Sequence, residues 1–434
     1  MIESELMQIK ERGTFNVFDK ACGDIVFAGF QSVSILLWLY AKRGGFIFDP
    51  GLGKTLTISG ALKLLHANDN SLKCLFFIKK SQITQTAKDV RLYSGLRVVT
   101  TTAESDQVST RMLFRNTDNY DVLMLTHETL DREDVMYFLY ENIYRFAVCV
   151  VDEAHYLLNY KESDRAMMLE AILPRFERVA LLTATPLLTS YEQFAYFLYL
   201  LDHVKFKDVS KMVSYMKDGN RLDTIFPLNI YNYDRASLGI PNIYNSIPVF
   251  VEPHDFQRGA TGEHVLQKTR GEGSVNQVTE LIRGIRVQKS RGKKGIVFCY
   301  YHNSREYMLP FFDKTDIKYG CIHGNTPQNE RDSVQNAFNS GELDVVIISV
   351  SEAINLDCDY VYLYQYTVKL KQIIGRAERG INPKIMDLFF MFTLDTGDAD
   401  YFIENIYKKA EFVRSAIGKE YTEFLELGRT LKEM

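Results

Sequence analysis

The chain of 434 residues lacks several features that mark particular classes of protein. No two of its six cysteines form a CxxC pair, which excludes the common zinc-ribbon and dithiol redox patterns. No apolar stretch is long enough to cross a membrane, and the polar N-terminus does not resemble a signal peptide. We therefore expect a soluble, intracellular protein with reduced cysteines and no membrane partner.

The chain also lacks an excess of either charge, with 51 basic and 55 acidic residues. This balance indicates that any site for a polyanion is local. Hydrophobic residues make up 46% of the chain, enough for a sizeable core and too many for a disordered protein. At roughly 150 residues per domain, the length suggests about two to four domains.

Short apolar runs alternate with amphipathic stretches, a pattern typical of parallel sheets covered by helices. Two blocks of the chain show this pattern. The predicted strands are 46–48, 74–78, 96–100, 122–125, 147–151 and 179–182 in the first block, and 295–300, 319–322, 344–348, 360–364 and 386–392 in the second. The resulting α/β prediction has doubly wound domains over 1–202 and 275–395, a linker region over 203–274 with some local structure, and C-terminal helices over 396–434.

The segment FIFDPGLGKTLTISGALKLL is predicted to form a strand, a glycine-rich turn and a helix. This context suits a phosphate-binding loop, in which Gly51 and Gly53 let backbone amides approach the phosphates. Lys54 would reach the β- and γ-phosphates, and the Thr55 hydroxyl would bind Mg²⁺. The strict GxxxxGK[ST] pattern is not met, because Phe48 stands at its first glycine. An ordinary glycine turn before a helix is the alternative.

Two further segments carry polar residues directly after predicted strands. FAVCVVDEAHYL places Asp152 and Glu153 where one carboxylate can hold Mg²⁺ and its neighbour can polarise a water molecule. RVALLTATPL places Thr183 and Thr185 where their hydroxyls can relay a change at the γ-phosphate. His155 has no second metal ligand at suitable spacing, so we expect a coupling hydrogen bond there. A solvated turn is the alternative for the first segment, and a threonine-rich turn closed by Pro186 is the alternative for the second.

In the second block, KQIIGRAERG places Gln372, Arg376 and Arg379 on one predicted helix face, because residues three and four apart meet on a helix. Such guanidinium groups are either a solvated patch or arginine fingers that neutralise charge on a transferred phosphoryl group. The residues alone leave both interpretations open.

Taken in this order, the segments resemble the motifs of superfamily 2 helicases, and most closely those of Swi/Snf-type ATPases. FQSVSILLWLYAKRGGFIFDPGLGKTL resembles the adenine-reading Gln motif and the first ATPase motif of that family. LLTATPLLTSYEQFAYFLYLL resembles its third motif, and KKGIVFCYYHNSREYMLPFF and IHGNTPQNERDSVQNAFNSGE resemble the opening motifs of its second domain. The resemblance covers about two thirds of the chain, over 29–202 and 276–380.

The resemblance implies two RecA-like domains with an ATP cleft between them, ATP and Mg²⁺ as cofactors, and nucleic-acid-dependent ATP hydrolysis. The implied catalytic residues are Lys54, Glu153, Arg376 and Arg379. The implied nucleotide-binding residues are Gln31, Gly51, Gly53, Lys54, Thr55 and Gln372, with Thr55 and Asp152 as metal ligands. The implied coupling residues are His155, Thr183 and Thr185.

The resemblance further implies a track for nucleic acid, most simply duplex DNA, with RNA as an alternative. The implied contacts are Lys79, Lys80, Ser81, Thr126, His127, His302, Asn303, Gly324 and Ser349. These are mainly hydroxyls, amides and lysines that bind phosphates without reading bases. The basic stretch over 283–294 is a further candidate, although a solvated helix and loop is the better interpretation.

Some positions depart from the family. Ala353 replaces the glycine of a GLNL-like motif, and FFIKKSQITQTAKDV lacks the usual proline and tryptophan. The sequence predicts a minimal double-stranded DNA translocase, with a strand-separating or annealing helicase as one alternative. An inactive P-loop scaffold, which binds nucleotide or a partner without turnover, is an alternative of another class. The composition, rich in Tyr, Phe and Asn, is also compatible with a phage or viral protein.

Overall fold

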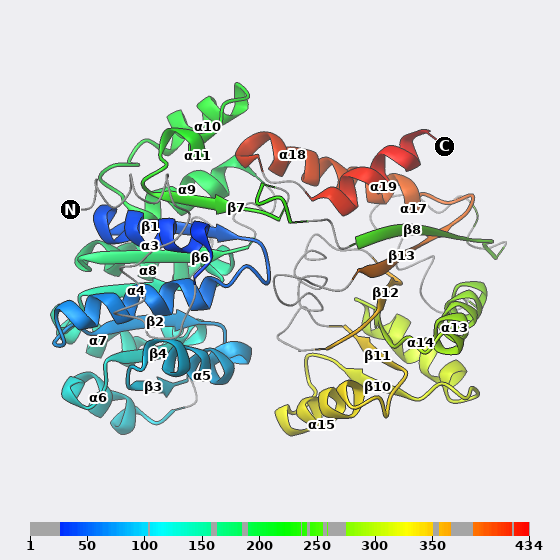
Figure 1. The fold of residues 1–434 in the computed structure, drawn as a ribbon, viewed down its shortest axis with the longest axis horizontal. Helices are drawn as coiled ribbons and strands as arrows, with labels where there is room; N and C mark the ends of the chain where they lie inside the picture. The colour runs from blue at the N-terminus through cyan, green and yellow to red at the C-terminus, as the bar shows by residue number, and fades with distance from the viewer. Residues whose placement is uncertain are drawn as a thin grey trace. The chain divides into compact units, whose positions relative to one another are not determined.

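The computed structural model describes residues 27–102, 105–157, 163–184, 190–235, 237–240, 244–254, 258, 275–349, 356–365, 385–418 and 421–433. The chain divides into two compact units. Unit 1 comprises Met1–Asp234 with Ser415–Lys419, and unit 2 comprises Arg235–Arg414 with Glu420–Met434. Figure 1 colours the main part of unit 1 from blue to green, and unit 2 from green to red.

Unit 1 is built on a seven-stranded sheet with the order β3-β4-β2-β5-β6-β1-β7. Every strand pair in the described sheet is parallel. The strands are β1 (Arg43–Phe48), β2 (Cys74–Ile78), β3 (Val98–Thr101), β4 (Val122–Thr126), β5 (Val148–Val151), β6 (Arg178–Thr183) and β7 (Ile230–Tyr233). Parallel order brings the carboxyl ends of all seven strands to one edge, where sites form in such sheets.

Helices connect the strands of unit 1 (Figure 1). They are α3 (Gly29–Ala41), α4 (Lys54–Asn68), α5 (Ile83–Ser94), α6 (Gln107–Arg115), α7 (Glu133–Asn142), α8 (Asp164–Ile172), α9 (Tyr191–Leu201), α10 (Val209–Lys217) and α11 (Leu222–Ile225). Short 3₁₀ turns follow several strands, including η1 (Lys80–Gln82), η3 (His127–Asp131) and η5 (Ala154–Leu157). Three of the predicted functional segments lie in these turns.

Unit 2 contains a six-stranded parallel sheet with the order β10-β11-β9-β12-β13-β8. Its strands are β8 (Tyr244–Val251), β9 (Gly295–Phe298), β10 (Tyr319–Ile322), β11 (Val345–Ile348), β12 (Tyr360–Leu363) and β13 (Met386–Thr393). Its helices are α13 (Val275–Ser290), α14 (His302–Phe312), α15 (Gln328–Asn339), α17 (Asp398–Phe402), the π-helix η8 (Ile403–Tyr407), α18 (Lys408–Ile417), whose last residues are assigned to unit 1, and α19 (Thr422–Glu433).

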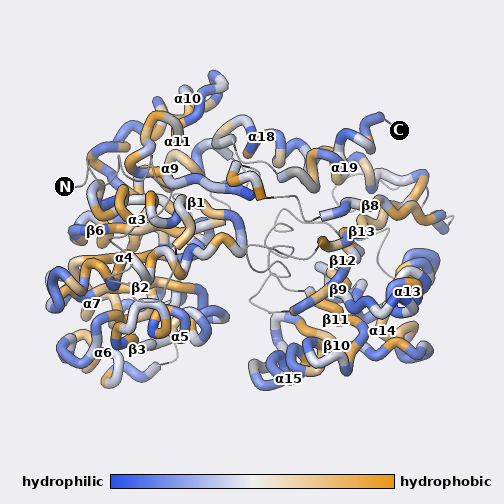
Figure 2. Tube along the Cα trace, viewed as in Figure 1, coloured by the Kyte–Doolittle hydropathy of each residue, from blue (hydrophilic) through white to orange (hydrophobic). Residues whose placement is uncertain are grey.

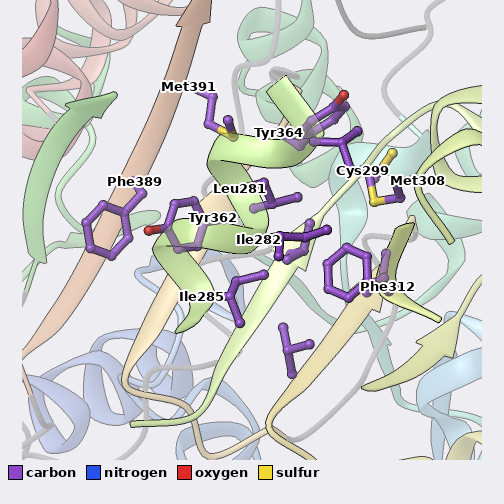
Figure 3. Packing of buried hydrophobic residues seen from close by; sticks show 14 of the residues in the cluster. Leu281, Ile282, Ile285, Cys299, Met308, Phe312, Tyr362, Tyr364, Phe389 and Met391 are labelled. Carbon is purple, nitrogen blue, oxygen red and sulfur yellow. The ribbon is translucent and has the colours of Figure 1, made fainter. Parts of the chain in front are cut away.

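Apolar side chains of the strands and helices form the core of unit 2. Figure 3 shows part of it, where the rings of Tyr362 and Phe389 stack with centroids 4.5 Å apart. Met308 and Phe312 of α14 are fully buried in the same cluster. In Figure 2 the strand β11 is orange and the helix α15 is largely blue, which matches a buried sheet beneath solvent-facing helices.

The predicted fold class is confirmed, with two parallel α/β sheets of the kind found in tandem RecA-like domains and a helical C-terminal segment. The strands β7 and β8 were not predicted. Both lie within 203–274, the segment interpreted as a linker, and β7 pairs with β1 whereas β8 pairs with β13. Each is the last strand of its sheet, a position that tolerates polar residues and the proline at Pro248.

Candidate active site

The phosphate-loop candidate lies between β1 and α4, at the carboxyl edge of the unit 1 sheet. Gly51 and Gly53 have φ angles of 80° and 78°, in the left-handed region that favours glycine. A Cβ atom at Gly53 would also lie 2.5 Å from Nε2 of Gln31. Lys54 opens α4 and donates a hydrogen bond from Nζ to the carbonyl oxygen of Phe48 at 3.0 Å. Backbone amides at a helix start, together with a lysine, suit a phosphate group.

Gln31, the predicted adenine-reading residue, ties the start of α3 to this loop. Its Oε1 accepts a hydrogen bond from the backbone amide of Ala28 at 3.0 Å, and its Nε2 donates to the carbonyl oxygen of Leu52 at 3.0 Å. Both groups of this buried amide therefore have partners within unit 1. Reading of adenine stays a prediction, and it would require these bonds to be shared with the base or exchanged for bonds to it.

Asp152 and Glu153 follow β5 at the same edge of the sheet. Asp152 is buried, and its Oδ1 accepts a hydrogen bond from the backbone amide of Glu153 at 2.8 Å. Burial, and then the neighbouring charge of Glu153, raise the pKa of Asp152 to about 7, while Lys54 lowers it. Glu153 has a φ of 49°, an uncommon conformation for a residue with a side chain.

A divalent cation fits this chemistry, because it would supply the positive charge that the buried Asp152 carboxylate needs. No group of three or more His, Cys, Asp or Glu residues suited to a metal occurs within the described part of the chain. Mg²⁺ commonly binds through one or two protein ligands and completes its shell with phosphates and water. A site made by Asp152 and Thr55 has this character.

His155 connects the turn after β5 to β6. Its Nδ1 lies 3.0 Å from Oγ1 of Thr183 and 3.3 Å from Oε2 of Glu153, and its side chain is almost entirely buried. The structure therefore brings together the predicted coupling residues His155 and Thr183 beside Glu153. The third of them, Thr185, lies outside the described residues.

The predicted nucleic-acid contacts of unit 1 lie after the neighbouring strands β2 and β4. Lys80 is exposed, and Lys79 and Ser81 are half-buried. Lys79 donates from Nζ to the hydroxyl of Tyr156 at 3.4 Å, which joins this turn to the segment after β5. All three residues are thus at least partly exposed to solvent, as a contact with nucleic acid requires.

Thr126 and His127 occupy a different environment, because both side chains are buried. Nε2 of His127 lies 2.9 Å from the carbonyl oxygen of Asp152, and burial lowers the pKa of this histidine to about 4. A neutral ring must donate its Nε2–H to that carbonyl. The side chain of His127 therefore holds the backbone at Asp152. This role was not predicted, because it depends on the pairing of segments that are distant in the sequence.

The predicted contacts of unit 2 lie after three neighbouring strands, in the order β10-β11-β9. His302 and Asn303 begin α14 after β9, Gly324 follows β10, and Ser349 follows β11. The first three are exposed, and Ser349 is half-buried. The fold thus gathers all four at one edge of the unit 2 sheet.

Arg331, which was not predicted as a functional residue, organises the loop after β10. Its Nε donates to the carbonyl oxygen of Thr326 at 2.7 Å, and its Nη2 donates to the carbonyl oxygens of His323 and Gly324 at 3.0 and 2.8 Å. A guanidinium that satisfies three carbonyls turns the loop's backbone in a defined direction. A single arginine at the start of a polar helix carries no signal of this role.

The basic stretch over 283–294 forms ion pairs with acidic residues on other segments. Arg286 lies 3.4 Å from Asp316, Lys289 lies 3.0 Å from Asp344, and Lys293 lies 2.9 Å from Asp387. This pairing favours the interpretation of a solvated helix and loop within unit 2 over a free patch for nucleic acid.

Two family models match the chain. An SNF2-related domain matches residues 30–218, and a helicase conserved C-terminal domain matches residues 274–381. The chain belongs to the superfamily 2 helicases of the Swi/Snf type. The two matched domains imply a nucleic-acid-dependent ATPase and the use of ATP with Mg²⁺.

Individual relatives of this Swi/Snf-type chain are distant. The ATP-dependent helicase SGS1 of Saccharomyces cerevisiae is 26% identical over 35% of the chain and 10% of its own length. The UvrABC system protein B of Mycoplasma mobile is 22% identical over 46% of the chain and 34% of its own length. The chain thus covers between a tenth and a third of these relatives. The solved structure of S. cerevisiae Dbp5 bound to RNA and ADP BeF3 covers 98% of both chains with a TM-score of 0.61 and 13% identity, a likeness of fold.

The matched C-terminal domain includes the motif with Gln372, Arg376 and Arg379, and it also includes Ala353. All four residues lie outside the described residues. The roles of these residues stay predictions. Among the residues that the structure describes, no helix is both long and apolar enough to span a membrane.

Proposed function

We propose that the chain is a double-stranded DNA translocase that couples steps along the duplex to hydrolysis of ATP to ADP and phosphate. One observation carries the proposal. The carboxyl edge of unit 1 gathers a glycine-rich phosphate loop, a buried carboxylate beside Lys54, and Glu153 within 3.3 Å of a histidine that contacts Thr183. An inactive scaffold that only binds nucleotide would require the phosphate loop, but neither the buried carboxylate nor Glu153 beside its histidine.

In this mechanism Lys54 and the amides after Gly51 and Gly53 bind the phosphates, and Gln31 lies where it can bind the adenine. Asp152 and Thr55 would hold Mg²⁺, which supplies charge that neutralises the phosphates. Glu153 orients the attacking water and accepts its proton. His155 transmits movement of this carboxylate to Thr183 and β6.

The second unit takes part through Arg376 and Arg379, which the family resemblance assigns to the γ-phosphate during turnover. Their contribution would depend on bound nucleic acid, so that hydrolysis follows engagement of the strand. Contacts to phosphates through Lys79, Lys80, Ser81, His302, Asn303, Gly324 and Ser349 would give binding without base specificity. Thr126 and His127 would act from inside unit 1 rather than on the strand.

Strand separation is a second candidate, because two of the matched relatives are named ATP-dependent helicases. Both candidates use the same ATP chemistry and differ in what happens to the duplex. RNA is the alternative substrate to DNA.

The test is ATP turnover by the full chain with single-stranded DNA, duplex DNA and RNA, followed by two motor assays. Duplex-stimulated turnover with displacement of a triplex strand, and without unwinding of a fork, supports the translocase. Fork unwinding favours the helicase. Nucleotide binding without turnover on any of the three nucleic acids overturns the proposal in favour of a scaffold.

A further inference from the structure

Arg305 is a buried cation at the edge of unit 2 where nucleic acid is proposed to bind. Met308 and Phe312 of α14 face the core (Figure 3), and Arg305 lies one and two turns before them in the first turn of the same helix, so it lies on the core-facing side. Only 3% of the residue is exposed. Burial disfavours a charge, and the start of a helix disfavours a cation in particular. An arginine at this position costs stability unless something compensates for it.

The guanidinium of Arg305 has two partners. Nη1 donates to the hydroxyl oxygen of Ser349 at 3.0 Å, and Nε and Nη2 donate to Oε1 of Glu306 at 3.2 and 2.7 Å. The same Glu306 carboxylate lies 3.7 Å from Nε2 of His302. One exposed carboxylate therefore faces two basic side chains of the edge.

The bond to Ser349 has a chemical consequence. A hydroxyl that accepts a hydrogen bond from a guanidinium keeps its own hydrogen for donation, and the cation polarises that O–H bond. Ser349 is half-buried at the carboxyl end of β11, next to the loop that Arg331 shapes. Its hydroxyl is thus prepared to donate to an anionic oxygen.

Glu306 weakens the binding of an anion at this edge. Its negative charge neutralises the guanidinium, and its carboxylate accepts hydrogen bonds from N–H groups that could otherwise donate to an anion. Its side chain is 53% exposed, so it can swing into solvent when a competing anion arrives. Carboxylate and phosphate bind guanidinium groups through similar geometry. Glu306 is therefore placed as an internal competitor of a phosphate.

We propose that Arg305 is a positioning residue that makes Ser349 a donor to a phosphodiester of the bound strand, and that Glu306 sets the affinity of this contact. The inference rests on the proposed function, since it names the ligand of that edge as the nucleic-acid backbone. It adds two residues that the motif resemblance did not supply. A buried arginine is unfavourable for stability, and such residues are commonly kept where a functional site uses their charge. This accounts for Arg305 in a core-facing position.

The test compares two charge-neutralising variants in unit 2. Glu306→Gln removes the competing carboxylate, whereas Glu342→Gln removes an exposed carboxylate before β11, at the opposite edge of the same sheet. Binding of a fluorescently labelled DNA duplex is measured by anisotropy over a series of salt concentrations. We expect Glu306→Gln to bind several-fold more tightly than wild type at low salt, with a salt slope steeper by up to about 1. Glu342→Gln should match wild type.

Because the Glu306 side chain is exposed, this first comparison does not depend on tolerance of a core change. Arg305→Gln should weaken binding, Arg305→Lys should restore part of it, and Ser349→Ala should abolish the difference between Arg305→Gln and wild type. Circular dichroism and thermal unfolding of each variant show which of them are folded. If the Arg305 variants do not fold, the comparison of Glu306→Gln with Glu342→Gln decides alone.

Equal affinity of Glu306→Gln and wild type, in a wild-type protein that binds DNA, overturns this inference and leaves the proposed function intact. A gain in affinity for ATP measured without DNA, in place of a gain for DNA, also overturns it, because the anion would then be a nucleotide phosphate. Wild-type protein that binds no nucleic acid overturns the proposed function and this inference together.

Discussion

At the carboxyl edges of two similar sheets, the proposed ATP site of unit 1 buries a carboxylate and the proposed nucleic-acid edge of unit 2 buries a guanidinium, and both edges also hold other buried acids, Asp49 after β1 and Asp398 after β13. In unit 1 the buried group is the carboxylate of Asp152, beside Glu153 and near Lys54. In unit 2 it is the guanidinium of Arg305, beside Glu306. A parallel sheet supplies the same edge in both units, so the difference lies in the side chains that follow each strand.

The difference matches the ligand that we propose for each edge. A buried carboxylate whose pKa is raised to about 7 is stabilised by a cation, as Mg²⁺ with a nucleotide would provide. The buried guanidinium of Arg305 is paired with Glu306, and in our proposal a backbone phosphate competes with that carboxylate. Similar sheets thus place a carboxylate at one proposed site and a guanidinium at the other, because the side chains after each strand, and not the sheet itself, set the charge.

The largest effect is expected from a variant that tests whether unit 2 takes part in ATP hydrolysis. Arg379→Ala should bind ATP nearly as wild type does and lose nucleic-acid-stimulated turnover by as much as roughly a thousandfold, because an arginine finger acts on the transition state. Turnover at saturating DNA measures the loss. Arg283→Ala, an exposed arginine of α13 beside Glu280, is the matched control. Full stimulated turnover in Arg379→Ala would remove Arg379 from its proposed role.

Removing charged groups of the unit 1 edge should cost about a hundredfold or more in turnover. Lys54→Ala should lose hydrolysis together with ATP affinity, because it removes charge that binds the phosphates. Glu153→Gln should keep ATP affinity and lose hydrolysis, because only the attacking water is affected. Parallel measurements of ATP binding and phosphate release separate the two variants. Comparable turnover in Glu153→Gln and wild type would remove Glu153 from its proposed role.

Gln31→Ala should reduce the preference for ATP over GTP by about 1 to 3 kcal/mol if the amide reads the adenine edge. Competition between the two nucleotides measures the preference. The structure adds a second expected effect, since the side chain also holds Leu52 of the phosphate loop. A variant with weaker binding of both nucleotides and unchanged preference would limit Gln31 to that structural role. Equal use of ATP and GTP by the wild type would rule out adenine reading altogether.

The raised pKa of Asp152 predicts a change of stability with pH in the nucleotide-free protein. The group titrates near 4 when unfolded and at about 7 when folded. Its contribution to stability is therefore fully present below about pH 4 and is lost as the pH rises through about 7. The free energy of unfolding of the wild type should fall over this range relative to Asp152→Asn, as measured by urea unfolding at a series of pH values. Parallel curves for the two proteins would contradict the burial argument.

The smallest effect is expected from the paired basic stretch of unit 2. Arg286→Gln removes one member of an exposed ion pair with Asp316, so the free energy of unfolding should change by less than about 1 kcal/mol. Affinity for DNA should stay near the wild-type value, in contrast to that of Glu306→Gln. A loss of DNA affinity in Arg286→Gln would make this helix part of the nucleic-acid site.

Local pattern in the sequence was sufficient for most of the fold. Inner strands such as β2 and β11 are continuous apolar runs, because a parallel strand covered on both faces needs apolar residues throughout. The outer strands β7 and β8 escaped prediction, since their segments carry asparagine, serine and proline. They become strands through pairing with β1 and β13, which lie far away in the sequence.

The candidate site divides in the same way. Lys54, Asp152, Glu153 and His155 could be predicted from the sequence because each lies within a short motif whose spacing is typical of such chemistry. The contact of His127 with the Asp152 carbonyl, and that of Arg305 with Ser349, join segments 25 and 44 residues apart. Such contacts depend on which strands become neighbours and on how deeply each side chain is buried. Sequence by itself determined the chemistry that the motifs carry, and only the tertiary structure decided where charge is buried and what it faces, because burial is a property of the packed sheets.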